Sequence, residues 1–286
     1  MKPNTRIAYY TTAETALHVI ENQTFWLRNP ELMNDYQEVI HGRTCLEAVL
    51  ADPEVVAAAG ASVEQVFPGL FADLVSTWVQ SAHSPSLRFV ASLSEIDVAD
   101  NRGTLSMWRA YGGSNGVALV MRDALMELDS NFVNTFHSPV LYGDASDVKG
   151  LVLEIFTKLA ALGDALSGTG ADFVKGRLLI ALEFAMLSIK HPGFKEEREW
   201  RMIHHFAQES VHHKYKSKVV RGNAEVLTEI NLASHPDLVP GTMIEKVIVG
   251  PCAFPASTAM AIRRAFHSTG GTIPEVVTSD IPLRHF

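Results

Sequence analysis

Two glutamates at alternate positions, Glu197 and Glu199, lie in a stretch that reads FKEEREWRMI. In a helix, Glu197 and Arg201 would form an i,i+4 ion pair on a solvated face, worth only about 0.3 kcal/mol. In a strand, Glu197, Glu199 and Arg201 share one face, and Trp200 points to the other. The preceding His-Pro-Gly favours the strand, because proline lacks a backbone donor and disfavours helical geometry in the residue before it. The sequence therefore predicts two carboxylates side by side on a strand.

Paired carboxylates suit more than one chemistry. Clustered carboxylates bind Mg²⁺, so one alternative is a metal-dependent nuclease that uses Glu197 and Glu199 with Asp35 or Asp100. Another alternative is a non-catalytic module that senses a nucleotide or a partner protein. The nuclease predicts nucleic-acid cleavage that a chelator abolishes, whereas the sensing module predicts binding that survives neutralisation of Glu199.

Histidine doublets occur at 204–205 and 212–213, but no H-E-x-x-H or cysteine-containing zinc pattern accompanies them. Adjacent histidines on a strand point to opposite faces, so we predict no resident metal. Basic residues gather in the same region, in HHKYKSKVVRG. These cations could contact a nucleic-acid phosphate, but a solvated, lysine-protected edge strand is the simpler interpretation.

Composition limits the class of protein. The chain has 286 residues, 47% of them hydrophobic, and a formal net charge of -8, which argues against a generic polyanion binder. Cys45 and Cys252 match neither a disulfide framework nor a zinc cluster, and both are expected to be buried thiols. The N-terminal stretch lacks the apolar core of a signal peptide, and no segment is apolar over a membrane-spanning length. We expect a cytoplasmic protein with no membrane partner.

Hydrophobic periodicity predicts strands near both ends of the chain and helices between them. The expected strands are 7–12, 24–28, 87–95, 116–122, 136–143, 215–221, 225–231, 244–250 and 274–279. Helices are expected at 13–22, with Thr12 as N-cap, and at 255–268. Helical insertions are expected near 36–82 and 145–190. We predict one α+β domain over 1–286, with a mixed or antiparallel split sheet.

Polar and aromatic residues recur at the ends of these segments. Singly, most of them have an ordinary structural role, but together they are what a nucleotide cleft would use. The candidates for binding a cofactor are Tyr10, Thr11, Arg28, Ser92, Ser94, Trp108, Tyr111 and Arg201.

Several stretches resemble a bacterial family known as domain of unknown function 2971. They are YYTTAETALHVIENQTFWLRNPELMND, SLSE, LSMWRAYGGSNGVALVM, FKEEREWR, IEKVIVGP and SDIPLR. They occur in the family's order and extend over nearly the whole chain.

More distantly, the arrangement is similar to the ADP-ribosyltransferase fold. That resemblance implies that Tyr10 and Thr11 hold NAD, although Tyr10 stands where histidine or arginine is usual. It places Ser92 or Ser94 on the central strand, makes Glu199 catalytic, and gives Glu197 the role of orienting the acceptor, a protein or a nucleic acid.

The expected chemistry is glycosyl transfer from NAD. Breaking the nicotinamide–ribose bond develops positive charge on the ribose, and a fixed carboxylate at Glu199 stabilises that state more than the ground state. Arg201 would keep Glu199 ionised or contact a phosphate. A toxin or a phage-defence effector is the biological role that we expect.

Overall fold

The computed structural model describes residues 4–32, 36–81, 88–122, 135–205, 213–220 and 222–282. The chain forms two compact units. The sheet unit comprises Met1–Leu32, Arg88–Pro139 and Glu196–Phe286, and the helical unit comprises Met33–Leu87 and Val140–Lys195. The two expected helical insertions thus belong to one compact unit.

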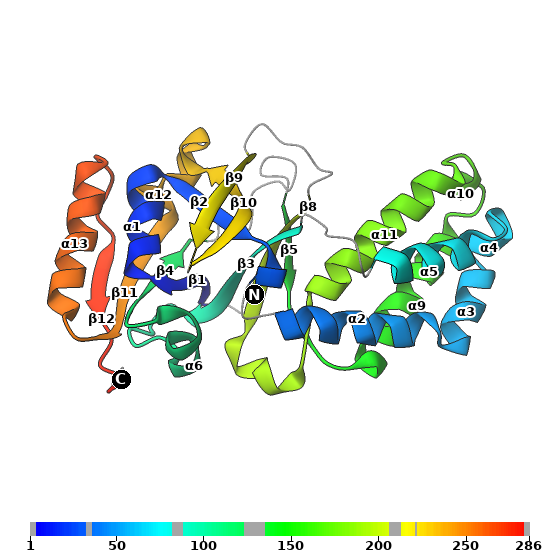
Figure 1. The fold of residues 1–286 in the computed structure, drawn as a ribbon, viewed down its shortest axis with the longest axis horizontal. Helices are drawn as coiled ribbons and strands as arrows, with labels where there is room; N and C mark the ends of the chain where they lie inside the picture. Colours follow the sequence, from blue (N-terminus) through cyan, green and yellow to red (C-terminus); the bar gives the residue numbers. More distant parts are fainter. Residues whose placement is uncertain are drawn as a thin grey trace. The chain divides into compact units, whose positions relative to one another are not determined.

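The sheet unit contains an open sheet that is antiparallel except where β11 and β12 run parallel (Figure 1). The main path, in spatial order, is β12 (Glu275–Thr278), β11 (Ile244–Cys252), β4 (Asn115–Met121), β1 (Thr5–Thr12), β3 (Arg88–Asp97), β2 (Thr24–Arg28), β10 (Asn223–Asn231) and β9 (His213–Val220). Off this path, β8 (Glu199–His205) pairs with both β3 and β5 (Phe136–Pro139). The expected α+β class with a mostly antiparallel sheet is confirmed.

Strand β3 is the branch point of the sheet. Its residue Ser94 lies opposite Ala8 of β1 on one side and opposite Glu199 of β8 on the other. Among the described registers, β1 pairs with β3 only as far as Ala8, and β3 meets β2 at Val90. The first strand, the central strand and the start of the carboxylate-bearing strand are therefore lateral neighbours.

Helices cover one face of this sheet. Helix α1 (Ala13–Asn22) begins where Thr12 Oγ1 accepts a hydrogen bond from the backbone N–H of Thr15 at 3.3 Å, as the sequence predicts for an N-cap. Helix α13 (Pro255–Ser268) packs beside α1, and the short α12 (Pro240–Met243) precedes β11 (Figure 1). The apolar side chains between these helices and the sheet form the main core. We call the face of the sheet that carries this core the helix-covered side.

The opposite, polar side of the sheet holds a smaller apolar cluster at the β1–β4–β11 end. It is closed by α6 (Leu105–Met107) and a π-helical turn, η3 (Trp108–Gly112). The loop before α6 is held by Lys246 of β11, whose Nζ donates to the Val98 carbonyl and to Asn101 Oδ1, both at 2.7 Å. Lys246 is 7% exposed, so these acceptors replace the water that its ammonium loses.

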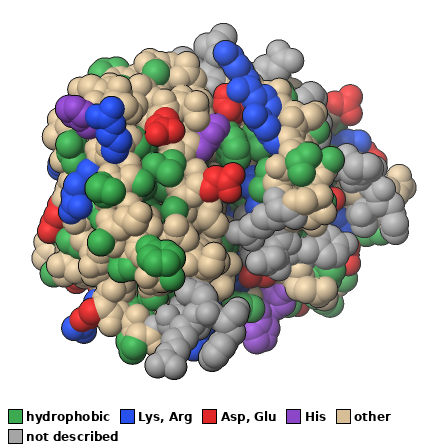
Figure 2. All heavy atoms as spheres, turned by 60° about the vertical axis from the view of Figure 1, so that its left-hand side comes forward, with side chains coloured by type: hydrophobic (Ala, Val, Ile, Leu, Met, Phe, Trp, Pro, Cys, Tyr) green, Lys and Arg blue, Asp and Glu red, His purple; other side chains and the backbone are tan. Residues whose placement is uncertain are grey.

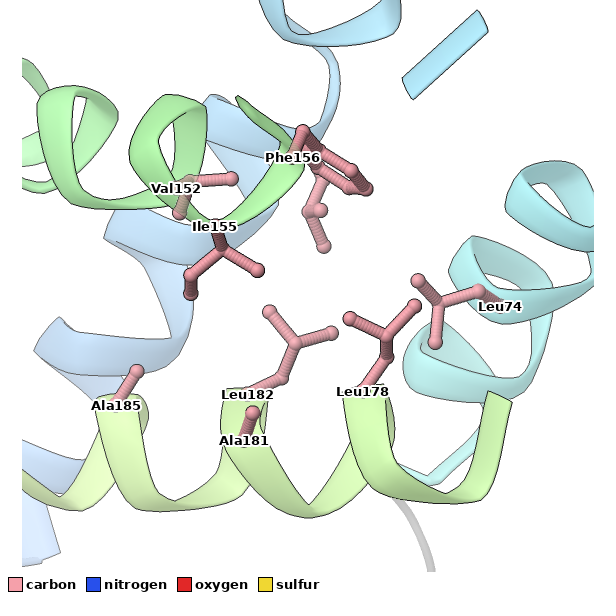
Figure 3. Close-up of a pocket in the computed structure, with 9 residues that line it drawn as sticks. Leu74, Val152, Ile155, Phe156, Leu178, Ala181, Leu182 and Ala185 are labelled. Carbon is pink, nitrogen blue, oxygen red and sulfur yellow. The ribbon is translucent and has the colours of Figure 1, made fainter. Parts of the chain in front are cut away.

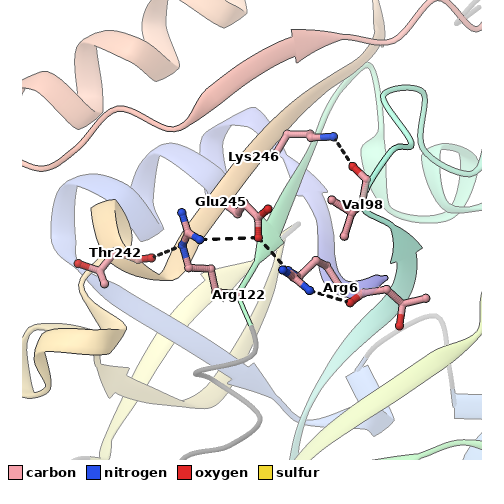
Figure 4. A network of polar contacts seen from close by, with 7 residues as sticks. Arg6, Val98, Arg122, Thr242, Glu245 and Lys246 are labelled. Atoms are coloured by element: carbon pink, nitrogen blue, oxygen red, sulfur yellow. Dashed lines mark hydrogen bonds and ion pairs between the residues drawn. The ribbon is translucent and has the colours of Figure 1, made fainter. Parts of the chain in front are cut away.

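A neighbouring ion-pair network ties three segments together near the register shift in β11 (Figure 4). Arg6 Nε donates to Glu245 Oε2 at 2.8 Å, and Arg122 Nη1 lies 4.0 Å from the same oxygen. Arg122 Nε also donates to the Thr242 carbonyl at 3.2 Å. Two arginines thus share one carboxylate, and each contact joins neighbouring parts of the sheet unit, so the network has a structural role.

The helical unit is built from helices and a small parallel sheet. The helices are α2 (Tyr36–Leu50), α3 (Pro53–Gly60), α4 (Val63–Val66), α5 (Leu70–Gln80), α9 (Ala145–Ala161), α10 (Asp164–Ser167) and α11 (Ala171–Leu187). The strands β6 (Leu141–Tyr142) and β7 (Ile189–Lys190) pair in parallel. Helices thus make up most of the described residues in the two stretches expected to be helical insertions.

The interior of the helical unit is apolar. Leu74, Val152, Phe156 and Leu178 line a cavity of about 30 Å³ (Figure 3). Sites for small molecules usually measure several hundred Å³, so this void is a packing defect with no room for a nucleotide. Within the described residues, no single helix is long and apolar enough to cross a membrane. One bent pair of helices, Pro53–Val66 and Leu70–Gln80, would be long and apolar enough when taken together.

The surface in Figure 2 is mixed in character. Its hydrophobic side chains lie in separate groups among polar ones, and acidic and basic side chains alternate over the described residues of this face. On this face, any concentration of positive or negative charge is therefore local.

Candidate functional site

The carboxylate segment folds differently from the prediction at its first half. Residues Pro192–Glu197 form a 3-10 helix, η4, and β8 begins only at Glu199. Between them Arg198 has a φ of 44°, in the left-handed region that a non-glycine residue seldom adopts. The predicted strand is confirmed for Glu199 to Ile203, but the prediction that Glu197 and Glu199 share one strand face is wrong.

Hydrogen bonds hold this corner in place. Ser94 Oγ donates to the Glu197 carbonyl, and the Glu95 N–H donates to the Arg198 carbonyl at 2.9 Å. Arg198 Nη2 donates back to the Glu95 carbonyl at 2.8 Å, and Trp200 Nε1 donates to Glu95 Oε1 at 3.0 Å. The first residue of β8 is thus positioned from two sides by β3.

The polar side of β3 and β8 carries four candidate residues, Ser92, Ser94, Glu199 and Arg201, which we call the β3–β8 site. Register places Ser94 opposite Glu199 and Ser92 opposite Arg201, so all four share one face. Arg201 Nε donates to Glu199 Oε1 at 2.7 Å, and Nη2 donates to Oε2 at 3.4 Å. Each of these two side chains is 1% exposed. These contacts fix the orientation of the carboxylate.

Ser92 Oγ has no hydrogen-bond partner among the described residues. Its side chain is buried, with Ser92 only 8% exposed. An unsatisfied buried hydroxyl costs about 1 to 3 kcal/mol, which is recovered when a ligand atom or water bonds to it. A donor or acceptor of a bound molecule would therefore find a partner at Ser92.

Tyr10, Trp108 and Tyr111 form a separate group. Tyr10 and Trp108 rings meet edge to face with centroids 4.8 Å apart, and both side chains are buried. Tyr10 Oη accepts a hydrogen bond from Thr104 N–H at 3.0 Å, and Trp108 Nε1 donates to the Arg102 carbonyl at 2.9 Å. Burial raises the pKa of the Tyr10 hydroxyl. The polar atoms of both rings are already used inside the cluster.

Trp108 is also surrounded by glycines. A Cβ at Gly103 would lie 2.6 Å from Trp108 Cζ2, and one at Gly250 would lie 2.7 Å from Cε3. A Cβ at Gly116 would lie 3.1 Å from the same Cε3. Gly103 additionally has a φ of 71°. Trp108 therefore fills a closed apolar space.

Thr11 is separated from its predicted partner Tyr10. In the β1–β4 register Tyr10 lies opposite Ala118 and Thr11 opposite Val117, so the two side chains point to opposite faces. Thr11 lies on the helix-covered side, away from the β3–β8 site. The resemblance implies that both residues hold the same cofactor. Because consecutive residues of a strand point to opposite faces, Tyr10 and Thr11 do not lie on one face of the sheet.

Arg28 lies on the polar side but is engaged with a residue that the sequence did not indicate. Its Nη2 forms an ion pair with Glu225 Oε1 at 2.8 Å, and its Nε donates to the same oxygen at 2.9 Å. One row away, Glu229 accepts from Trp26 Nε1 at 3.1 Å and from Lys216 Nζ at 2.5 Å. Burial alone would raise the pKa of Glu229, but these two hydrogen bonds outweigh it and lower the pKa.

The histidines lie on the other side of the sheet. His204 and His213 stack with ring centroids 4.1 Å apart. His204 Nε2 lies 2.8 Å from Tyr215 Oη, and His213 Nδ1 lies 3.1 Å from Thr228 Oγ1. These rings are buried in the core and bonded to hydroxyls, an arrangement that the sequence spacing gave no means to foresee.

Metal-binding side chains do not gather in the described part of the chain. No group of three or more His, Cys, Asp or Glu there is placed to hold an ion. Asp100 Oδ1 accepts hydrogen bonds from the N–H groups of Arg102 at 2.7 Å and Gly103 at 3.1 Å, which orders its own loop. Asp35 lies outside the described residues.

The fold and site define an α+β protein with an open, mostly antiparallel sheet and a buried carboxylate–arginine pair on its polar side. Residues 107–202 match the family model described as protein of unknown function (DUF2971). This match covers about a third of the chain, including all of η3 and the start of β8, and supports the resemblance to that family. No curated protein matches the chain, and no solved structure does.

Proposed function

We propose that the β3–β8 site binds NAD and breaks its nicotinamide–ribose bond, in the manner of the ADP-ribosyltransferases. The observation that carries the proposal is the lateral row of Ala8, Ser94 and Glu199. It makes neighbours of the three strands to which the resemblance assigns the cofactor-binding, central and catalytic residues. The toxin or phage-defence role belongs to the same proposal.

The residues of the site fit such a ligand at two points. Ser92 Oγ offers an unsatisfied buried hydroxyl to a polar atom of the nucleotide. Arg201 holds Glu199 through two hydrogen bonds, so the carboxylate is oriented by the protein itself. Glu197 contributes its backbone carbonyl to Ser94, which makes it a positioning residue in this proposal.

NAD, when bound, would supply the glycosidic bond that breaks: nicotinamide leaves with the bonding electron pair, and the ribose C1′ forms its new bond to a nucleophile of the acceptor, a protein or a nucleic acid, which loses its proton. Glu199 acts on the positive charge that develops at the ribose as nicotinamide leaves, because a fixed anion in a dry site stabilises that charge strongly. Arg201 holds the carboxylate in one orientation through its two hydrogen bonds, so that the anion does not have to be reoriented as the charge develops. Ser92 orients the sugar or the amide through its free hydroxyl.

The test is nicotinamide release from NAD, measured by chromatography, together with NAD binding measured by calorimetry. We expect Glu199→Gln to abolish release, and Glu196→Gln, a change of the same kind at an exposed neighbour, to leave it unchanged. Ser92→Ala removes an unsatisfied atom, so it should keep the fold and weaken NAD binding. Release that survives in folded Glu199→Gln protein would overturn the assignment.

A second candidate is a non-catalytic nucleotide-sensing module. It is favoured by the near-complete burial of the Glu199–Arg201 pair, since such pairs often serve structure alone. This candidate predicts NAD binding that depends on Ser92 with no nicotinamide release. The metal-dependent nuclease stays a prediction, to be checked by cleavage of nucleic acid with and without a chelator.

A further inference from the structure

Strand β9 carries three lysines on the polar side of the sheet. Lys214, Lys216 and Lys218 alternate along the strand, and their positions lie about 6.6 Å apart at the usual rise per residue. Within the described residues β9 pairs only with β10, so it forms an edge of the sheet. The strand therefore presents a row of cations beside an open backbone edge.

The acidic residues behind this row are already neutralised. Glu229 accepts a hydrogen bond from Lys216, and Glu225 forms its ion pair with Arg28. Both carboxylates are buried, at 7% and 5% exposed. Their negative charge is used inside the sheet and does not offset the outer lysines.

Lys214 and Lys218 are exposed and form no ion pair with any described residue. Elsewhere, Lys158 and Lys175 pair with Glu154 and Asp73, respectively, at 2.7 Å. The positive charge of β9 is thus an unbalanced local feature in a chain whose net charge is -8. An anionic partner is the chemistry that matches it.

An aromatic ring lies in the same patch. The half-buried Trp26 has Lys218 Nζ 6.0 Å from its ring centroid and the His18 ring at 4.2 Å. Trp26 shares the sheet face with Lys214, because both lie opposite Glu229 in the register. A cation row beside an aromatic face is the combination with which proteins hold unpaired nucleotides.

We propose that the lysine face of β9 is a binding surface for single-stranded nucleic acid. Phosphates contact Lys214 and Lys218, and one base stacks near Trp26. An acidic peptide would use the lysines and the strand edge but leave the aromatic ring without a role. A duplex would offer phosphates while keeping its bases stacked internally, so the single strand fits both features.

The test uses a fluorescein-labelled single-stranded oligonucleotide of mixed sequence and measures anisotropy over a range of salt concentrations. The variant Lys214→Gln/Lys218→Gln is compared with Lys158→Gln/Lys195→Gln, which removes the same charge from other exposed positions. Losing two phosphate contacts should reduce the salt slope by about 1.4 and the affinity at 0.1 M salt by roughly 25-fold. The control pair should change neither quantity comparably.

Two further measurements make the proposal specific. Trp26→Leu should lower affinity roughly tenfold, and binding should quench tryptophan fluorescence in the parent protein but less in this variant. Absence of binding, equal losses in both lysine variants, or equal competition by polyglutamate would overturn the proposal, the last outcome pointing to an acidic protein partner. These readouts do not involve NAD, so they stand whether or not Glu199 is catalytic.

Discussion

Removing Arg201 alone should destabilise the protein more than removing both members of its ion pair. Arg201 and Glu199 side chains are each 1% exposed, and their closest N–O distance is 2.7 Å. The change Arg201→Met leaves a carboxylate buried without its cation. The double change Glu199→Met/Arg201→Met replaces both charges by apolar side chains of similar length.

The magnitude follows from the cost of an uncompensated buried charge. Breaking a buried pair from one side costs about 3 to 5 kcal/mol, whereas replacing both members is often close to neutral. For a protein of this size, a loss of about 3 kcal/mol lowers Tm by roughly 6 to 12 °C. The coupling between the two sites should therefore reach at least about 2 kcal/mol.

The assay is thermal and urea unfolding of the parent, both single variants and the double variant, followed by circular dichroism and tryptophan fluorescence. If Arg201→Met costs less than about 1 kcal/mol, or if the double variant loses the sum of the single losses, then the pair is not coupled as its geometry requires. A folded double variant also serves the NAD assay, because it separates loss of the carboxylate from loss of the fold.

Two other results are expected. Gly250→Ala should lower the free energy of unfolding by about 1 to 3 kcal/mol, because its Cβ would lie 2.7 Å from a Trp108 ring carbon. Gly60→Ala is the control, since open space surrounds that position. Equal Tm values for the two variants would contradict this expectation. Burial lowers the pKa of His18 below its ordinary value of 6.5, so the unfolded chain binds protons more readily. Stability should thus fall as pH drops below 6.5, and His18→Gln should flatten that part of the Tm profile.

Much of the fold was accessible from local sequence signals. The prediction of helix 13–22 with Thr12 as its cap matches α1, and helix 255–268 matches α13. Buried strands such as β4 and β11 lie within one or two residues of the predicted bounds. These elements have apolar periodicity, caps or prolines at their ends, so short-range physics decides them.

The site was less accessible because its contacts are non-local. Arg28 pairs with Glu225, 197 positions away, and Ser94 bonds to Glu197 across 103 positions. The left-handed Arg198 carries no glycine or asparagine signal, so the end of η4 and the start of β8 could not be located from sequence. The alternation of side chains along β1, by contrast, could be predicted from the sequence. It is sufficient to place Thr11 and Tyr10 on opposite faces of the sheet.

Trp108 imposes a shared constraint on positions that are distant in sequence. Its ring atoms are the nearest obstacles to a Cβ at Gly103 and at Gly250. Positions 108 and 250 are therefore expected to be epistatic. A smaller residue at 108 would leave a cavity by itself, yet it would remove the closest contact of an alanine at 250, so the double change should cost less stability than the sum of the two single changes.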